Sequence, residues 1–190
     1  MELLEERIRK DGVVRGEDVL KVDSFLNHQL DPLLLDEIGK EFFRLFGGER
    51  VDRILTIEAS GIAVAVMAAR YFGCPVVFAK KSRTVNQARD VYASSAYSFT
   101  HKTENRIIVS KEYLHEGERV LLIDDFLANG QSLRALRDIV LQAGAEPVGA
   151  GIVIEKAFQP GGDELRGEGL RIESLARIRS MSERDGIRFC

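Results

Sequence analysis

The stretch VLLIDDFLANGQS, residues 120–132, joins a short apolar run to two adjacent aspartates and then to a small polar turn that contains a glycine. The apolar run predicts a buried strand. In open sheets of parallel strands, ligands bind outside the carboxyl ends of the strands, so we expect Asp124 and Asp125 at the rim of a binding crevice. This stretch therefore predicts both a type of fold and the location of its site.

The segments around this stretch alternate between strand and helix. Apolar, β-branched runs predict further strands, and segments of helical length that end at a glycine lie between them. Apolar strands that alternate with helices are typical of a parallel sheet covered on both faces. We therefore predict an α/β fold with an open, mostly parallel sheet. The predicted strands are 53–57, 76–79, 120–123 and 148–154, and the predicted helices are 62–72 and about 130–143.

The first fifty residues precede this alternation. Residues 2–11 predict a short amphipathic helix, and residues 32–46 predict a second one with Pro32 in its first turn. The half-apolar segment 12–27 between them has no clear period, and we expect it to be irregular.

Three later segments interrupt the alternation. The polar segment 82–95 has neither the helical nor the strand period and predicts a long, functional loop. Residues 97–100 and 106–109 predict a hairpin, and residues 170–178 alternate in the way expected of a strand at the edge of the sheet.

Length and composition limit the class of protein. A chain of 190 residues with 45% hydrophobic content can close one core, so we expect residues 1–190 to form a single domain. Lys and Arg number 27 against 30 Asp and Glu, and this net charge of −3 gives no overall attraction to nucleic acid. No apolar run approaches the roughly 20 residues that span a bilayer. Cys74 and Cys190 are too few for a disulfide framework, which fits a cytoplasmic protein. From the net charge and the short apolar runs, we expect it to bind neither nucleic acid nor membrane.

The turn after the acidic pair predicts a phosphate site. Residues 128–132 bring small side chains and free backbone amides to a helix N-terminus, where phosphate groups commonly bind. The carboxylates of Asp124 and Asp125 can accept hydrogen bonds from sugar hydroxyls or hold magnesium. A phosphorylated ribose satisfies both features. The residues of this turn are Ala128, Asn129, Gly130, Gln131 and Ser132.

From the residues alone, three other interpretations of the acidic pair compete with a phosphorylated-ribose site. The two aspartates would be helix caps in the simplest case, although one Asp suffices for a cap. A nucleotide-hydrolase strand that ends in acids requires a GxxxxGK[ST] loop, and the sequence has none. A phosphoacceptor aspartate on a flavodoxin-like sheet leaves the phosphate turn unexplained.

The stretch at 120–132 resembles the phosphoribosyl pyrophosphate signature of the type I phosphoribosyltransferases. Asn129 stands where a Thr is common in that family. The resemblance extends over nearly the whole chain and is specific to the members of the family that act on xanthine, in which Asn is the usual residue at this position. The further segments that carry it are VDSFLNHQ (22–29), TIEASGIA (56–63), AYSFT (96–100), IVIEKAFQPG (152–161) and ESLARI (173–178).

This resemblance implies a fold and a reaction. It implies the type I phosphoribosyltransferase fold, in which a small hood, formed here by about residues 1–30 and the segment after 156, covers the base. The implied reaction displaces pyrophosphate from C1 of phosphoribosyl pyrophosphate by a ring nitrogen of xanthine, and it yields xanthosine 5′-monophosphate. Magnesium as cofactor and a homodimer are implied as well.

The resemblance also assigns the site residues. Asp124 and Asp125 are the expected catalytic pair and candidate magnesium ligands, and the turn at 128–132 is expected to bind the phosphoribosyl phosphate. Small residues after the first sheet strand let backbone amides approach pyrophosphate, although the same pattern fits an ordinary strand-to-helix turn. The expected pyrophosphate residues are Ala59, Ser60, Gly61 and Lys81, with Arg83 and Arg89 as further candidates in the loop, and the expected xanthine residues are Leu20, Asn27 and Lys156.

Two alternatives to the xanthine enzyme stay open from the sequence. A phosphoribosyltransferase for hypoxanthine and guanine, or for a pyrimidine, would differ in the hood and around Lys156. A regulator that senses phosphoribosyl pyrophosphate without catalysis would need a basic face or a helix-turn-helix extension to bind nucleic acid, and the first fifty residues have neither.

Overall fold

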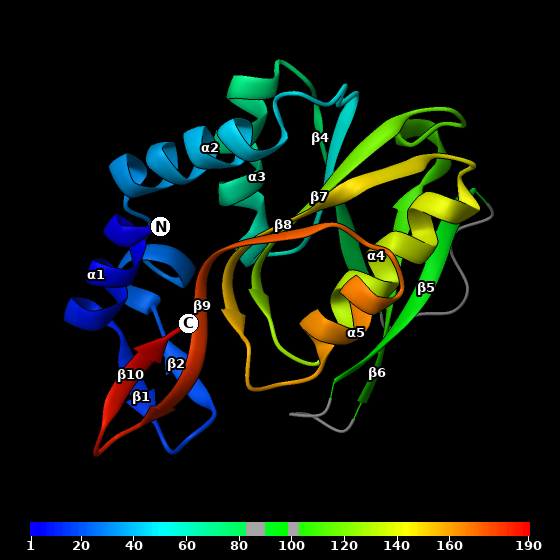
Figure 1. Cartoon of the computed structure of the whole chain (residues 1–190). Coiled ribbons are helices and arrows are strands. Elements are labelled where there is room, and N and C mark those ends of the chain that lie inside the picture. The colour runs from blue at the N-terminus through cyan, green and yellow to red at the C-terminus, as the bar shows by residue number, and fades with distance from the viewer. Residues whose placement is uncertain (83–89, 99–102) are drawn as a thin grey trace.

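The computed structural model of the chain describes residues 1–82, 90–98 and 103–190, and its centre is an eight-stranded sheet (Figure 1). The strands are β3 (Arg53–Ile57), β4 (Val76–Ser82), β5 (Val91–Ser98), β6 (Thr103–Ser110), β7 (Arg119–Leu127), β8 (Glu146–Lys156), β9 (Ile172–Ser182) and β10 (Gly186–Phe189). Their order across the sheet is β10-β9-β8-β7-β3-β4-β6-β5. Arg83, Arg89 and residues 99–100 of the predicted hairpin lie outside the described residues.

The five strands at the middle of the sheet run parallel, as predicted. β3 pairs in parallel with β4 on one side and with β7 on the other. β7 also pairs in parallel with β8, and β8 with β9, which ends the parallel block. Antiparallel pairs flank this block on both sides: β4 with β6 and β6 with β5 on one side, and β9 with β10 on the other. The carboxyl ends of β3, β4, β7 and β8 consequently lie along one edge of the sheet.

Helices cover both faces of the sheet, which confirms the predicted layers (Figure 1). On one face, α1 (Glu2–Asp11), α2 (Pro32–Phe46) and α3 (Ser60–Phe72) contribute to a core that includes Phe42 and Phe46. On the other face, α4 (Gln131–Gln142) and α5 (Gly161–Gly167) close a second core. Both cores rest on the apolar strands that alternate with these helices in sequence.

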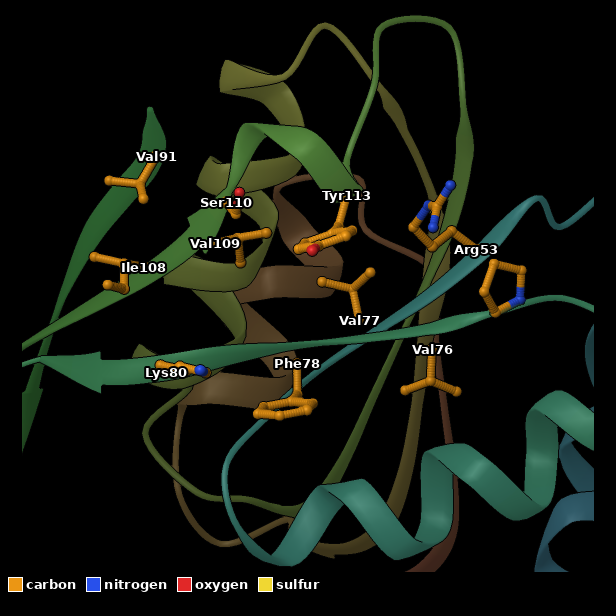
Figure 2. A pocket seen from close by; sticks show the side chains of 11 residues that line it. Arg53, Val76, Val77, Phe78, Lys80, Val91, Ile108, Val109, Ser110 and Tyr113 are labelled. Carbon is orange, nitrogen blue, oxygen red and sulfur yellow. The ribbon is translucent and has the colours of Figure 1, made fainter. Parts of the chain in front are cut away.

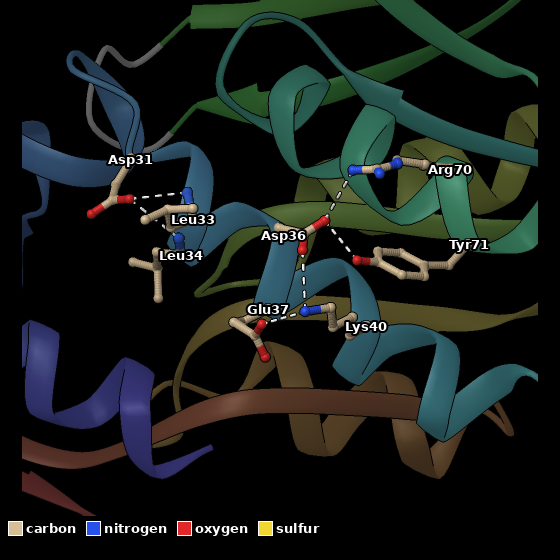
Figure 3. Close-up of polar contacts among 8 residues, drawn as sticks. All are labelled: Asp31, Leu33, Leu34, Asp36, Glu37, Lys40, Arg70 and Tyr71. Atoms are coloured by element: carbon tan, nitrogen blue, oxygen red, sulfur yellow. Dashed lines mark hydrogen bonds and ion pairs between the residues drawn. The ribbon is translucent and has the colours of Figure 1, made fainter.

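The start of α2 shows why the chain turns into a helix at Pro32. Asp31 accepts hydrogen bonds from the backbone N–H groups of Leu33 and Leu34, at 3.1 and 3.2 Å, so it caps the helix (Figure 3). Proline fits at the next position because the first helical residue needs no N–H partner. Further along α2, Asp36 accepts a hydrogen bond of 2.6 Å from the hydroxyl of Tyr71 on α3, which ties the two helices together (Figure 3).

Several boundaries differ from those expected. Residues 170–178 were expected to form a strand at the edge of the sheet. The strand is confirmed as β9, but its place at the edge is wrong, because the short β10 pairs with β9 and lies outside it. Four residues are too few to show a strand period in a sequence. The predicted loop 82–95 is also wrong in part, because β5 begins at Val91. β5 is polar in sequence because it lies at the open edge of the sheet.

The segment expected to be irregular, residues 12–27, contains regular structure. β1 (Val13–Arg15) and β2 (Val19–Lys21) form a two-stranded antiparallel hairpin, and a π-helical turn follows at Asp23–Asn27. The hairpin turn contacts the turn between β9 and β10, where the N–H of Gly16 donates to Glu183 at 3.0 Å. The two hairpins therefore meet although they lie at opposite ends of the sequence (Figure 1). Among the described residues, no helix has the length and hydrophobicity needed to cross a membrane.

Candidate active site

The two aspartates lie at the end of β7, as predicted, and their environments differ. Asp124 is 5% exposed, whereas Asp125 is half-buried. The carboxylate of Asp124 accepts a hydrogen bond of 3.0 Å from the N–H of Asp125. Burial, and secondarily the neighbouring charge of Asp125, raise the pKa of Asp124 well above its usual value, while the positive charge of Lys81 acts in the opposite direction. A buried carboxylate in this state is suited to a cationic or hydroxyl-bearing ligand.

The turn between β3 and α3 packs directly against this acidic pair. A Cβ atom on Gly61 would lie 2.1 Å from Oγ1 of Thr56 and 3.4 Å from Oδ1 of Asp124, so only glycine fits between them. α3 begins at Ser60, and its N-cap residue Ala59 makes no side-chain cap, so no cap from that residue occupies the amides of Ser60 and Gly61. Glu58 precedes a cis peptide bond to Ala59.

β4 ends beside this turn. The backbone N–H of Lys81 donates to the carboxylate of Glu58 at 2.6 Å, and the side chain of Lys81 is exposed. Because its charge also acts on the buried Asp124, Lys81 lies within electrostatic range of the acidic pair. The structure thus brings together the predicted catalytic pair and the predicted pyrophosphate residues from three different strands.

The predicted phosphate turn forms the N-terminus of α4. Gly130 is the N-cap residue and has a φ of 79°, a left-handed conformation that favours glycine. A Cβ atom there would also lie 2.9 Å from Leu165 of α5. Within the turn, the N–H of Gln131 donates to Oδ1 of Asn129 at 3.3 Å. Gly130, the N-cap residue, has no side chain to cap α4, so the other amides of this turn remain available to an anion.

Lys156 ends β8 and reaches the hairpin formed by β1 and β2. Its Nζ donates to the carbonyl oxygen of Asp18 at 2.5 Å and lies 5.8 Å from the centre of the Phe126 ring. Burial lowers the pKa of Lys156. Because Phe126 directly follows the acidic pair, the ammonium group of Lys156 stands on the same edge of the sheet as Asp125.

The other two predicted base residues lie in the N-terminal segment. Leu20 is 7% exposed and belongs to the core beneath the β1–β2 hairpin. Asn27 ends the π-helical turn, and its buried Oδ1 has no hydrogen-bond partner among the described residues. Among the described residues, no side-chain hydrogen bond joins Asn27 to Lys156. The structure therefore does not connect these two predicted base residues directly.

Comparison with known proteins identifies the family to which this site belongs. The family model of the phosphoribosyl transferase domain matches residues 21–164, which include the β3–α3 turn, the acidic pair and the turn at 128–132. This chain belongs to the phosphoribosyltransferase family.

Its curated relatives agree over nearly the full length of this phosphoribosyltransferase. The xanthine phosphoribosyltransferase of Alkaliphilus metalliredigens is 60% identical over 183 residues, which cover 96% of this chain and 91% of the relative. The xanthine phosphoribosyltransferase of Lachnoclostridium phytofermentans is 56% identical over 98% of this chain and 96% of that protein.

Solved structures of other phosphoribosyltransferases share the fold. The adenine phosphoribosyltransferase of Rhodothermus marinus superposes with a TM-score of 0.75 at 18% identity, covering 93% of this chain and 99% of that chain. The enzyme of the same name from Saccharomyces cerevisiae gives a TM-score of 0.74 at 19% identity, covering 92% of this chain and 99% of that chain. At such identities the likeness concerns the fold alone.

Two features of the phosphoribosyltransferase site were not predicted from the sequence. They are the carbonyl of Asp18 and the buried carboxylate of Glu155, which is 1% exposed. For Glu155, the one local signal was a charged residue after the apolar run of β8. Its partners come from α5 and β9, and no local pattern links those segments.

A cavity of about 510 Å³ lies elsewhere in the phosphoribosyltransferase, where β4 and β6 diverge (Figure 2). Val76, Phe78 and Tyr113 are among its apolar lining residues. None of the predicted site residues lines it, so its size does not make it the active site.

Proposed function

We propose that this phosphoribosyltransferase transfers the 5-phosphoribosyl group from phosphoribosyl pyrophosphate to xanthine, forming xanthosine 5′-monophosphate and pyrophosphate in purine salvage. The names of the relatives at 53–60% identity support xanthine as the base. The observation that carries the reaction is the meeting, on one sheet edge, of the buried Asp124, the open turn at 128–132 and the Gly61 turn.

The donor is held from three sides in this proposal. The backbone amides of Ala128, Asn129, Gly130, Gln131 and Ser132 bind its 5-phosphate, because they stand at an uncapped helix N-terminus. Asp124 and Asp125 accept hydrogen bonds from the ribose hydroxyls. The amides of Ala59, Ser60 and Gly61, together with the ammonium of Lys81, bind pyrophosphate.

Magnesium fits this site if substrate oxygens complete its ligands. The adjacent carboxylates of Asp124 and Asp125 are hard oxygen donors of the kind that magnesium prefers. Among the described residues, no cluster of three or more acidic, histidine or cysteine side chains forms a complete metal site. Magnesium bound between these carboxylates and the donor would neutralise charge on the departing pyrophosphate.

The base is held on the other side of the ribose. The ammonium of Lys156 donates to a purine oxo group, and the side-chain amide of Asn27 meets the 2-oxo group of xanthine. Leu20 supports this base site from within the hood, which consists of residues 1–30 and the segment after 156. The enzyme's task is to hold both reactants in line while positive charge develops on the ribose and the amides stabilise the leaving anion.

We further propose that residues 1–190 form one domain, that the active form is a homodimer and that the enzyme works in the cytoplasm. One sheet carries both apolar cores, which supports a single domain. Large exposed apolar side chains, such as Val66 and Phe78, support association. Cys74 and Cys190 are free, as in a reducing compartment.

A substrate panel tests the proposed function. Xanthine, guanine, hypoxanthine, adenine and orotate are each incubated with phosphoribosyl pyrophosphate and magnesium, and pyrophosphate release is measured. We expect the highest kcat/KM for xanthine. Turnover confined to adenine or orotate would refute the xanthine assignment, and binding of the donor without turnover of any base would identify a sensor instead.

A further inference from the structure

The buried carboxylate of Glu155 lies at the centre of a partly exposed polar cluster at the end of β8. Arg166 donates to it from both terminal nitrogens, at 2.8 and 2.7 Å, Ser174 donates from its hydroxyl at 2.5 Å, and Arg177 donates from Nε at 3.2 Å. Burial by itself would raise the pKa of Glu155, but the hydrogen bonds from Arg166 and Ser174 outweigh it, so the pKa lies below its usual value. Glu155 is therefore a charged anchor with its hydrogen-bonding capacity satisfied.

This anchor fixes the short helix α5 against the sheet. Arg166 belongs to α5, which has seven residues and no side-chain cap at its N-terminus. The ion pairs of α5 with Arg134 on α4 are partly exposed to solvent, where such pairs contribute little. A Cβ atom on Gly162 would lie 2.4 Å from Oε1 of Glu155, so the first turn of α5 rests directly on the carboxylate.

The first turn of α5 in turn supports the turn at 128–132. The N–H of Gly161 donates to the carbonyl oxygen of Ala128 at 3.2 Å. A Cβ atom on Gly161 would lie 2.4 Å from the backbone nitrogen of Gly130, so the two backbones touch without an intervening side chain. A shift of α5 therefore moves the amides of this turn.

We propose that Glu155 is a positioning residue for the donor substrate, because its carboxylate, through Arg166 and α5, holds the turn at 128–132 in the conformation that binds the 5-phosphate. The inference rests on the proposed function only in assigning the phosphate to that turn. The ammonium of Lys156 lies outside this chain of contacts, since it is held by the carbonyl of Asp18 in the β1–β2 hairpin. The effect of Glu155 is thus selective for the donor over the base.

The variant Glu155→Gln tests this inference. Glutamine keeps the shape of the side chain but replaces one acceptor oxygen by an NH₂ group that faces the donors of Arg166 and Ser174. We expect the Kd for ribose 5-phosphate, measured by calorimetry, and the KM for phosphoribosyl pyrophosphate to rise about tenfold, because small misplacements of binding groups are costly. The KM for xanthine should change less than about twofold, since its site keeps its contacts.

The matched control is Asp163→Asn, on the same helix. Asp163 is exposed and approaches the same two arginines, Arg166 and Arg177, only at 3.7 and 3.9 Å, so its removal should leave both constants unchanged. If Glu155→Gln does not fold, Ser174→Ala, which removes a single donor, replaces it and should raise the same two donor constants to a smaller extent.

Two results would overturn the inference: a folded variant with donor constants equal to those of the wild type, or one in which the xanthine KM rises at least as much as the donor KM. A wild-type protein that does not bind ribose 5-phosphate would instead refute the proposed function.

Discussion

At the scale of single residues, the two aspartates of the acidic pair lie in different environments. Asp124 is buried and has a raised pKa, whereas Asp125 is half-buried beside it. Two like charges side by side, one of them buried, are unfavourable for the folded protein unless a ligand compensates them. The acidic pair therefore lowers the stability of the free protein, and a bound ligand that compensates the charges can restore that stability.

The variant Asp125→Asn should lower kcat while leaving the fold intact. An amide accepts hydrogen bonds from ribose hydroxyls less strongly than a carboxylate, and losing a charged partner corresponds to about 10- to 100-fold in rate. Steady-state kinetics with circular dichroism as a check on folding measures the effect. Asp138→Asn on the exposed side of α4 is the control, and near-normal kcat in Asp125→Asn would contradict the role of the pair.

The variant Asp124→Asn should stabilise the protein at neutral pH. The folded-state pKa of Asp124 is raised, so its ionisation costs stability at pH 7, and that cost disappears as pH falls below the pKa of the unfolded chain. We expect a gain of about 1–2 kcal/mol at pH 7.5 that shrinks toward pH 4, read from thermal unfolding.

The pKa of Asp31 is shifted in the opposite direction, so its contribution to stability depends on pH in the opposite way. Hydrogen bonds from Arg7 and from the start of α2 lower the pKa of Asp31. Its contribution to stability is therefore present above the unfolded pKa and lost as pH falls through the folded one. Asp31→Asn should lower Tm at pH 7.5, with an effect that fades in acid, and a parallel pH profile for both variants would contradict the assigned shifts.

At the scale of elements, the junction of β3 and α3 shows how closely turn and strand are packed. The hydroxyl of Thr56, which has no partner among the described side chains, occupies the space next to Gly61. A residue with a side chain at position 61 must displace either that hydroxyl or the start of α3.

The variant Gly61→Ala should destabilise the protein by about 1–3 kcal/mol and raise the KM for the donor, because its Cβ would lie 2.1 Å from Oγ1 of Thr56. The double variant Thr56→Ala/Gly61→Ala should recover most of the loss, since the Thr56 Cβ itself is 3.5 Å away, an ordinary contact. Thermal unfolding and donor kinetics measure both. Gly48→Ala, in open space, is the control, and an absence of recovery would show that the clash lies elsewhere.

At the scale of the whole molecule, Lys156 joins the sheet to the β1–β2 hairpin near the N-terminus. Its ammonium contacts the β1–β2 hairpin through Asp18, and the same hairpin contacts the β9–β10 turn through Gly16 and Glu183. The surroundings of Lys156 are therefore shaped by segments far apart in sequence, as the 167-residue separation of Gly16 and Glu183 illustrates.

The variant Lys156→Ala should raise the KM for xanthine about tenfold or more, because it removes a charged donor to the base. The KM for phosphoribosyl pyrophosphate should stay within about twofold, since the turn at 128–132 keeps its support from α5. Lys21→Ala in the same hairpin is the control, because Lys21 is exposed on the side opposite Leu20. An unchanged xanthine KM would move base recognition to different residues.

Most of the sheet, and the residues of the proposed donor site, could be predicted from the sequence because their signals are local. Each of these signals lies within a few neighbouring positions. They are the apolar run before Asp124, the small residues at 59–61 and the glycine of the turn at 128–132. The roles of Leu20, Asn27 and Lys156 came only from the family resemblance, since a lysine after a strand is usually solvated.

By itself, the amino-acid sequence determined the alternation of strands and helices. It also determined the end of the sheet at which the acidic pair and the turn at 128–132 meet, because periodicity and turn chemistry act over short distances. Only the tertiary structure decided which strand takes the edge beyond β9, that Glu155 is buried on Arg166, and that the β1–β2 hairpin reaches Lys156. These features depend on contacts between distant segments, and such contacts leave no periodic trace in either segment alone.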